Sequence, residues 1–173
     1  MLVETLPDVF QRGLEFAYDC DHQLIKGLPK LIEAVSSQPL KAAFERQLEE
    51  SQQQLTRLEQ VFAGQKRAPA GESNGAIQSL LGEAEKMIKH IDPSPLRDAA
   101  IIVQGNLIQH NKIAQYGCVL ALALVLKLEN AARLLEQSLD EEKAADRTLT
   151  EIAVAVNQQA VGFQNTPHGF AII

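Results

Sequence analysis

Apolar residues recur at helical spacing through most of the chain, in stretches separated by proline, glycine and short polar runs. The first stretch predicts a helix over about residues 8–34. Thr5, Pro7 and Asp8 form a typical start for it, because threonine can accept hydrogen bonds from the free N–H groups of the first turn and proline has none to satisfy. Pro29 lies late in this stretch and predicts a kink or a local break.

The same start signal, serine followed by proline, recurs at residues 36–39 and predicts a second helix over about 38–62. Gly64 is a natural end for that helix. Residues 63–75 are rich in glycine, alanine, proline and polar residues, which indicates a loop. A shorter amphipathic stretch then predicts a helix over about 76–90.

The segment Asp92-Pro93-Ser94-Pro95 ends one helix and begins another. From Leu96 the apolar periodicity continues to about Val161, and a single helix of about 65 residues would be about 100 Å long. We therefore expect a break near residues 127–130 and two helices, over about 96–126 and 130–160. Residues 162–173 mix glycine, proline and apolar residues and are expected to be a non-helical tail.

Four long helices and one short helix predict an all-α fold. Short loops join the first long helix to the second and the third to the fourth, whereas the short helix lies in the long connection between the second and the third. This is the plan of a ferritin-like antiparallel four-helix bundle with a crossover. We expect residues 1–161 to form this bundle.

Composition supports a globular helical protein, since hydrophobic residues make up 46%, charged residues 22% and aromatic residues only 5%. The net charge of −6 argues against nucleic acid or an anionic membrane as a partner. The longest apolar run, residues 118–126, is too short to cross a bilayer, and the N-terminus has no basic region of the kind found in secretory signals.

Cys20 and Cys118 match no metal-binding spacing. We expect two buried free thiols in a cytoplasmic protein, although the sequence leaves a disulfide open.

Polar residues on the inward stripes are the informative ones, because the core of a four-helix bundle is otherwise apolar. One or more such residues lie near the middle of each long helix: Asp21 on the first, Gln47, Glu50 and Gln54 on the second, Gln109 and Lys112 on the third, Glu142 and Asp146 on the fourth. Several buried carboxylates at one level need a counter-charge, which a metal pair or a lysine can supply. The alternative is that these residues are solvated at the borders of helix faces.

The chain resembles the bacterial ferritin-like stress-protein family that includes YciE and YciF, over about Val9 to Ala153. The resemblance implies a ferritin-like bundle, often dimeric, whose core can hold a di-metal site. The matching segments are Tyr18 with Gln23-Leu24, Leu48-Glu49-Glu50-Ser51, Arg57-Leu58-Glu59-Gln60-Val61-Phe62, Arg97-Asp98-Ala99-Ala100, Ile113-Ala114-Gln115-Tyr116-Gly117 and Leu139-Asp140-Glu141-Glu142-Lys143-Ala144-Ala145-Asp146.

The chain departs from the pattern of that family where metal ligands are expected. Gln47 replaces a histidine of the second helix, and Gln137 replaces a glutamate near the fourth-helix motif. The third-helix motif Glu-His-Tyr-Glu reads Gln109-His110-Asn111-Lys112 here. Glutamine cannot bridge two metals as a carboxylate does, and the charge of a lysine repels a divalent ion.

We therefore expect no bound metal or other cofactor and a network in which Lys112 pairs with Asp21, Glu50 or Glu142, while Gln54 and Gln109 satisfy the remaining polar groups. In the alternative, Lys112 reaches out to the bundle surface, and a weakened iron or manganese pair is held by a set of carboxylates. These would be Asp21, Glu50, Glu142 and Asp146. His22 and His110 lie off the core stripe and are expected at the surface.

The sequence favours a non-enzymatic, stress-associated structural or interaction module. The alternative is a di-iron or di-manganese oxidase or iron-handling protein with an atypical ligand set. The third long helix is apolar over more than one side at residues 119–126, which predicts a homodimer. Other protein partners stay open, although the apolar residues Phe163, Phe170, Ile172 and Ile173 of the tail would suit an adaptor that docks on a partner.

Overall fold

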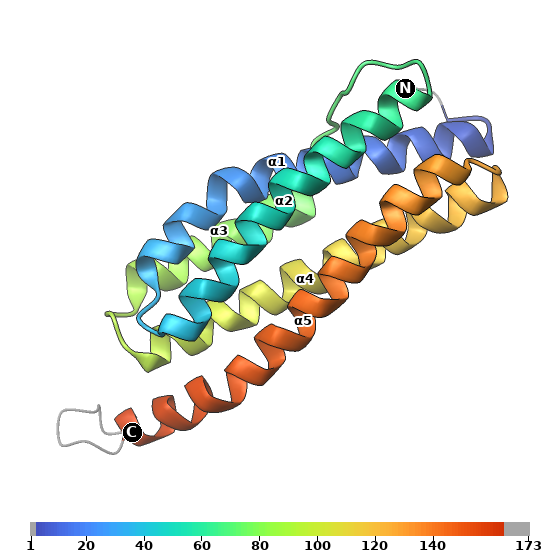
Figure 1. Cartoon of the computed structure of the whole chain (residues 1–173). Coiled ribbons are helices and arrows are strands. Elements are labelled where there is room, and N and C mark those ends of the chain that lie inside the picture. Colours follow the sequence, from blue (N-terminus) through green and yellow to red (C-terminus); the bar gives the residue numbers. More distant parts are fainter. Residues whose placement is uncertain (1–2, 165–173) are drawn as a thin grey trace.

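The computed structural model describes residues 3–164, and over that range it contains five helices and no strand (Figure 1). This confirms the all-α prediction, and the helix bounds agree with the expected ones to within a few residues. The helices are α1 (Leu6–Ala34), α2 (Gln38–Gly64), α3 (Gly75–His90), α4 (Pro95–Val125) and α5 (Glu129–Gln164). None of the described helices is long and apolar enough to cross a membrane.

The four long helices form one bundle, and α3 runs along its side within the connection from α2 to α4 (Figure 1). Neighbouring long helices are antiparallel. On α4, Arg97 donates to the Ala34 carbonyl at the end of α1, whereas Lys112 meets Asp21 in the middle of α1. The short helix packs against α1 and α4. The predicted antiparallel bundle with a crossover helix is therefore confirmed.

The helix starts follow the sequence signals. The Thr5 hydroxyl accepts from the backbone N–H of Asp8, and the Asp8 carboxylate accepts from the backbone N–H of Thr5 at 2.9 Å, which is a reciprocal capping box. Ser37 caps α2 and Ser94 caps α4, each followed by a proline in the first turn. These side chains satisfy N–H groups that the helices themselves leave without partners.

Lysines in the left-handed conformation end two of the long helices. Lys127 has a φ of 55°, and the backbone N–H of Leu128 returns to the Ala123 carbonyl at 2.9 Å, which ends α4. Lys66 has the same φ and ends α2 in the same way, two residues after the glycine that the sequence suggested. The break near residues 127–130 was predicted, but no glycine marks it because a lysine takes the position that glycine usually occupies.

Three features of the chain differ from the expectation. Pro29 causes no local break in α1, which runs through it; the proline is exposed, and the packing of Leu28 and Leu31 outweighs the lost hydrogen bond. The helix α5 continues to Gln164 rather than ending before residue 162, and the rest of the predicted tail lies outside the described residues. Both cysteines are free as expected, but only Cys20 is buried and Cys118 is exposed.

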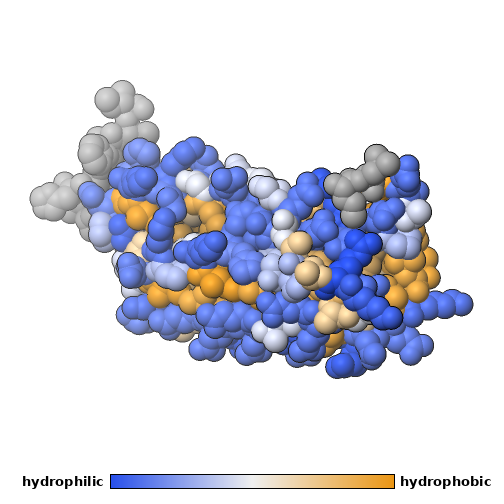
Figure 2. Space-filling view, turned by 90° about the horizontal axis from the view of Figure 1, so that it is seen from above, coloured by the Kyte–Doolittle hydropathy of each residue, from blue (hydrophilic) through white to orange (hydrophobic). Residues whose placement is uncertain are grey.

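The core consists of two apolar clusters. One lies toward the α1–α2 loop and includes Leu28, Phe44 and Ile101, and the other lies toward the α4–α5 loop and includes Leu14 and Phe62. The predicted polar residues of the helix centres lie between the two clusters. On the face seen in Figure 2, hydrophilic side chains predominate, and apolar ones gather at the end near the N-terminus and in a band over the opposite half.

Glycines allow close packing between helices at several points. A Cβ atom on Gly13 of α1 would lie 2.5 Å from Cγ1 of Val119 on α4, and one on Gly105 of α4 would lie 3.3 Å from Cε1 of Phe44 on α2. By contrast, a Cβ atom on Gly82 of α3 would meet nothing within 4 Å. Gly27 of α1 is closely approached as well, since a Cβ atom there would lie 2.9 Å from Cδ2 of Leu81 on α3, whereas Gly82 is not required by the packing of the chain.

We expect Gly13→Ala to lower the free energy of unfolding by about 1–3 kcal/mol, because Val119 is buried and β-branched and cannot move aside cheaply. The matched control, Gly82→Ala, should raise it by about 0.5–1 kcal/mol, since alanine is the better helix former. Urea unfolding of both variants measures the difference. Equal effects of the two changes would contradict the close approach of α1 and α4.

Candidate functional site

A buried lysine lies at the centre of the bundle. The Lys112 side chain, on α4, is 1% exposed. Its Nζ atom lies 2.8 Å from Oδ1 of Asp21 on α1 and 2.7 Å from Oε1 of Glu142 on α5. The ammonium also donates to Oε1 of Gln54 at 2.7 Å and to Oγ of Ser51 at 3.3 Å, both on α2. One positive charge therefore connects all four long helices.

Each carboxylate that pairs with Lys112 has a further donor. The Tyr116 hydroxyl, one turn along α4, donates to Oδ2 of Asp21 at 2.6 Å. The Gln109 amide donates both to the Glu142 side chain and, at 2.9 Å, to the Glu142 backbone carbonyl. Asp21 and Glu142 are almost completely buried, and these bonds replace the water that they lose on folding.

Gln47 fixes the orientation of the Gln109 amide group. Its Oε1 atom accepts from Nε2 of Gln47 on α2 at 2.7 Å, so the nitrogen of Gln109 faces Glu142. The sequence pattern placed both glutamines on inward stripes, and both are buried. They connect α2 to α5 through α4 with neutral groups only.

A second ion pair extends the network toward the surface between α2 and α5. Gln54 donates at 3.1 Å to Oε2 of Glu141, which receives two hydrogen bonds of 2.6 Å from the Arg57 guanidinium. Arg57 also donates to Oγ of Ser138 at 3.2 Å. A bidentate ion pair of this kind fixes the orientation of the carboxylate. Because the Gln54 nitrogen donates to that carboxylate, the Gln54 oxygen faces Lys112.

The pKa values of this network follow from burial and charge. Burial alone would lower the pKa of Lys112, but the carboxylates of Asp21 and Glu142 outweigh it, and the pKa lies above its usual range. Burial raises the pKa of Glu142, and Lys112 offsets only part of this rise. Burial and the neighbouring Asp21 raise the pKa of the Tyr116 hydroxyl. Lys112 is therefore charged at neutral pH and Tyr116 is not.

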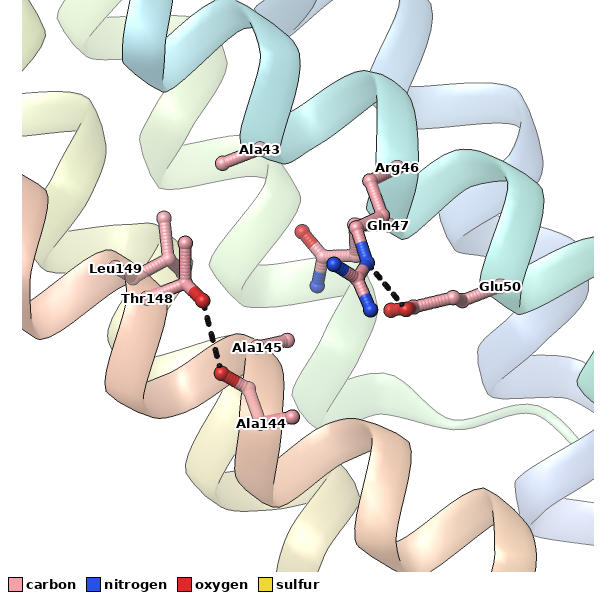
Figure 3. A pocket seen from close by; sticks show the side chains of 8 residues that line it. All are labelled: Ala43, Arg46, Gln47, Glu50, Ala144, Ala145, Thr148 and Leu149. Carbon is pink, nitrogen blue, oxygen red and sulfur yellow. Dashed lines mark hydrogen bonds and ion pairs between the residues drawn. The ribbon is translucent and has the colours of Figure 1, made fainter.

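Two predicted site residues lie outside the network. Glu50 pairs with Arg46 at 2.8 Å, beside a small cavity of about 40 Å³ between α2 and α5 (Figure 3). Asp146 lies at the edge of α5, with its Oδ1 atom 3.5 Å from Nε2 of His110, whose side chain is 67% exposed. The expected pairing of Lys112 with Asp21 and Glu142 is thus found, and the alternative pairing with Glu50 is not.

Some members of the network were missed by reasoning from sequence. The sequence pattern predicts no polar role for Ser51 or Tyr116, and Arg57 and Glu141 stand out only through the family resemblance. For Tyr116 a signal was available, because a tyrosine on a core stripe needs a partner for its hydroxyl. Arg57 and Glu141 lie on different helices with no sequence relation, so only the packing of α2 against α5 reveals the pair.

Comparison with known proteins places this geometry in a family. The model of a family described as a domain of unknown function, DUF892, matches residues 5–161. The chain belongs to the DUF892 family. It is 36% identical to protein YciF of Escherichia coli K12 over 162 residues, which cover 92% of this chain and 98% of the relative.

Two solved structures similar to this chain show the same bundle. The crystal structure of the E. coli stress protein YciF superposes with a TM-score of 0.87 at 34% identity and covers 91% of this chain and 99% of that one. YcfI of Rhodopseudomonas palustris, provisionally described as a structural protein, gives a TM-score of 0.83 at 35% identity, with 86% of this chain and 94% of that one covered.

The residues at the centre of this DUF892 member do not fit the di-metal site that the resemblance implies. A lysine ammonium lies where a cation would lie, within 2.8 Å of both central carboxylates. The neighbouring Gln47 and Gln109 offer neutral oxygens, and Glu50 turns to Arg46. Within the described residues, no three histidine, cysteine or acidic side chains are placed to hold a metal ion.

We expect Lys112→Ala to lower the free energy of unfolding by about 3–5 kcal/mol, because Asp21 and Glu142 would be left buried without a counter-charge. Lys143→Ala, which removes a half-exposed lysine of α5, is the control and should cost less than about 0.5 kcal/mol. Denaturant unfolding at pH 7 measures both. A neutral effect of Lys112→Ala would contradict the central role of this side chain.

The stability conferred by Lys112 should also depend on pH. The pKa of Lys112 is raised above the ordinary 10.5 by folding, so the folded protein retains a proton that the unfolded chain releases, and stability falls as pH rises above 10.5. The stability difference between wild type and Lys112→Ala should therefore shrink as pH rises above about 10.5. Unfolding at a series of pH values above 10.5 tests this, and a difference that continues to grow over that range would refute the assignment.

Proposed function

We propose that this protein is a non-enzymatic member of the ferritin-like group, a structural or interaction module in which an internal ion pair takes the place of a di-metal centre. The observation that carries the proposal is the Lys112 ammonium, buried within 2.8 Å of Asp21 and Glu142. A lysine at this point holds the carboxylates together without any bound ion.

The neutral glutamines support the proposal. Gln47 donates to the Gln109 oxygen and Gln109 donates to Glu142, so the Gln109 oxygen faces Gln47 and not a metal ion. A di-iron or di-manganese protein, the alternative function, would need Lys112 and Gln109 to point away from the centre. Both side chains are instead buried within it.

The relatives agree with a role of this kind. E. coli YciF is described as a stress protein, and YcfI of R. palustris provisionally as a structural protein. The central carboxylates, amides and ammonium of this chain are closed off, since Asp21, Gln109 and Lys112 are each 1% exposed or less. We place the protein in the cytoplasm, where the exposed thiol of Cys118 would stay reduced.

Metal analysis tests the proposal directly. The protein purified without chelator should contain no stoichiometric iron, manganese or zinc, because Lys112 repels divalent ions and the glutamines supply no charge. Incubation with ferrous or manganous ions followed by desalting should leave the content unchanged. Retention of two tightly bound ions per chain would overturn the proposal in favour of the di-metal alternative.

A variant that reverses the substitutions should regain a metal site. Gln47→His, Gln109→Glu and Lys112→Glu together should take up two ferrous or manganous ions. Its metal-free form should be less stable than wild type, because the carboxylates repel one another. Metal at one hundred times its Kd should restore about 2.7 kcal/mol. The control, Gln47→His with Gln109→Glu and Lys112 retained, should bind no metal, and equal metal uptake by both variants would show that Lys112 is not what excludes the ions.

A further inference from the structure

A small cavity between α2 and α5 borders the buried network around Lys112 (Figure 3). Its volume is about 40 Å³. Because a water molecule needs about 10–15 Å³ by this measure, the cavity has room for about three waters. Alanines on both helices, Ala43 of α2 and Ala144 and Ala145 of α5, form part of its wall, and their short side chains leave this space open.

The polar groups at the cavity suit water. Gln47 is 4% exposed, and its amide group points into the space between α2 and α5 (Figure 3). The amide nitrogen donates to Gln109 at 2.7 Å, whereas no residue in the described part of the chain donates to the oxygen. Buried polar atoms of native proteins nearly always have a partner, and ordered water supplies it where the protein does not. The side chains of Glu50 and Thr148, which also line the cavity, offer such a water further hydrogen bonds.

An ion pair on α2 lies between the cavity and the solvent. Nε of Arg46 donates to Oε1 of Glu50, one turn further along the helix, at 2.8 Å. The Arg46 side chain is 73% exposed and that of Glu50 only 12%, so the guanidinium covers the carboxylate from the solvent side. Exposed side chains change rotamer within nanoseconds. The guanidinium can therefore move aside while the helices stay in place.

On its inner side the cavity leads to the centre of the bundle. Gln47 donates to Gln109, which donates in turn to the side chain of Glu142. Glu142 pairs with Lys112 at 2.7 Å. The last three of these residues are each 1% exposed or less, so they have no direct contact with bulk water. A water bound to Gln47 is thus joined to the ionic centre through a single intervening amide, that of Gln109.

We propose that the cavity binds water and is the route by which solvent reaches the buried network, with the pair of Arg46 and Glu50 as its lid. The rival route is the contact at Arg57, where Gln54 donates to Glu141. There the guanidinium is 10% exposed and is held to the carboxylate by two hydrogen bonds of 2.6 Å. It moves aside less readily than Arg46, which makes one hydrogen bond to its partner. Solvent should therefore enter at the cavity and not at Arg57.

Hydrogen exchange of the glutamine side chains, measured by NMR, tests the route. In Arg46→Ala, the amide protons of Gln47 and Gln109 should exchange with solvent about tenfold faster than in wild type, because the opening is local. Those of Gln54 should keep their rate. Gln54 is the internal reference, since it belongs to the same network but faces the contact at Arg57. Loss of an exposed ion pair changes the unfolded fraction by only about twofold, so global unfolding does not produce the expected difference.

Two further variants complete the test. Arg12→Ala, the matched control, removes another partly exposed ion pair, that of Arg12 with Glu72 at 2.7 Å, which lies away from the cavity. It should leave the exchange of all three glutamines unchanged. Ala145→Val in the Arg46→Ala background narrows the cavity and should return the two glutamines of the route to near their wild-type rates. Circular dichroism checks that each variant keeps the helical fold.

Three results would overturn the proposal. The first is an unchanged exchange rate of Gln47 and Gln109 in Arg46→Ala. The second is an equal acceleration of Gln54, which would indicate a general loosening or entry at Arg57. The third is an equal effect of Arg12→Ala. None of these measurements depends on metal binding, so their outcome is independent of the proposed function.

Discussion

The bundle depends on one ammonium group shared by four helices. Lys112 pairs with carboxylates of α1 and α5 and donates to two side chains of α2 from its own position on α4. A buried ion pair of this kind adds little net stability relative to an apolar layer, because desolvation costs about as much as the attraction returns. What it adds is alignment. Sliding any one helix by a single turn, about 5.4 Å, would leave a charge without its partner.

The two apolar clusters on either side of this layer have no comparable means of fixing the register. Leucine and phenylalanine tolerate repacking, whereas the directions of hydrogen bonds from Gln109 and Tyr116 do not. The buried polar residues around Lys112, here called the polar layer, thus determine which residues of the four helices lie at the same level. The two apolar clusters supply most of the free energy of folding. Nearer the surface, the ion pair between Arg57 and Glu141 fixes the level of α2 relative to α5 in the same way.

Much of this arrangement could be predicted from sequence because it depends on helical periodicity. Asp21, Lys112 and Glu142 lie on inward stripes, and serine followed by proline marks two of the helix starts. Glu50 was predicted to face the core, but Ser51 does so instead. Consecutive residues of a helix point about 100° apart, so an error of one residue in the helix phase moves the inward position from one to the other. Lys127 gave no signal of its left-handed conformation, and the pairing of Arg57 with Glu141 depends on how two helices pack, which periodicity along one helix does not contain.

The polar layer holds two carboxylates for one ammonium, and this excess has a consequence for acid conditions. The pKa of Glu142 is raised above the ordinary 4.5 by folding, so the folded protein binds a proton before the unfolded chain does. Between that raised value and 4.5, falling pH favours the folded state through Glu142. Protonation removes the surplus negative charge and leaves Lys112 paired with Asp21. Most proteins lose buried ion pairs as the medium is acidified, but here mild acid brings the centre of the molecule to charge balance.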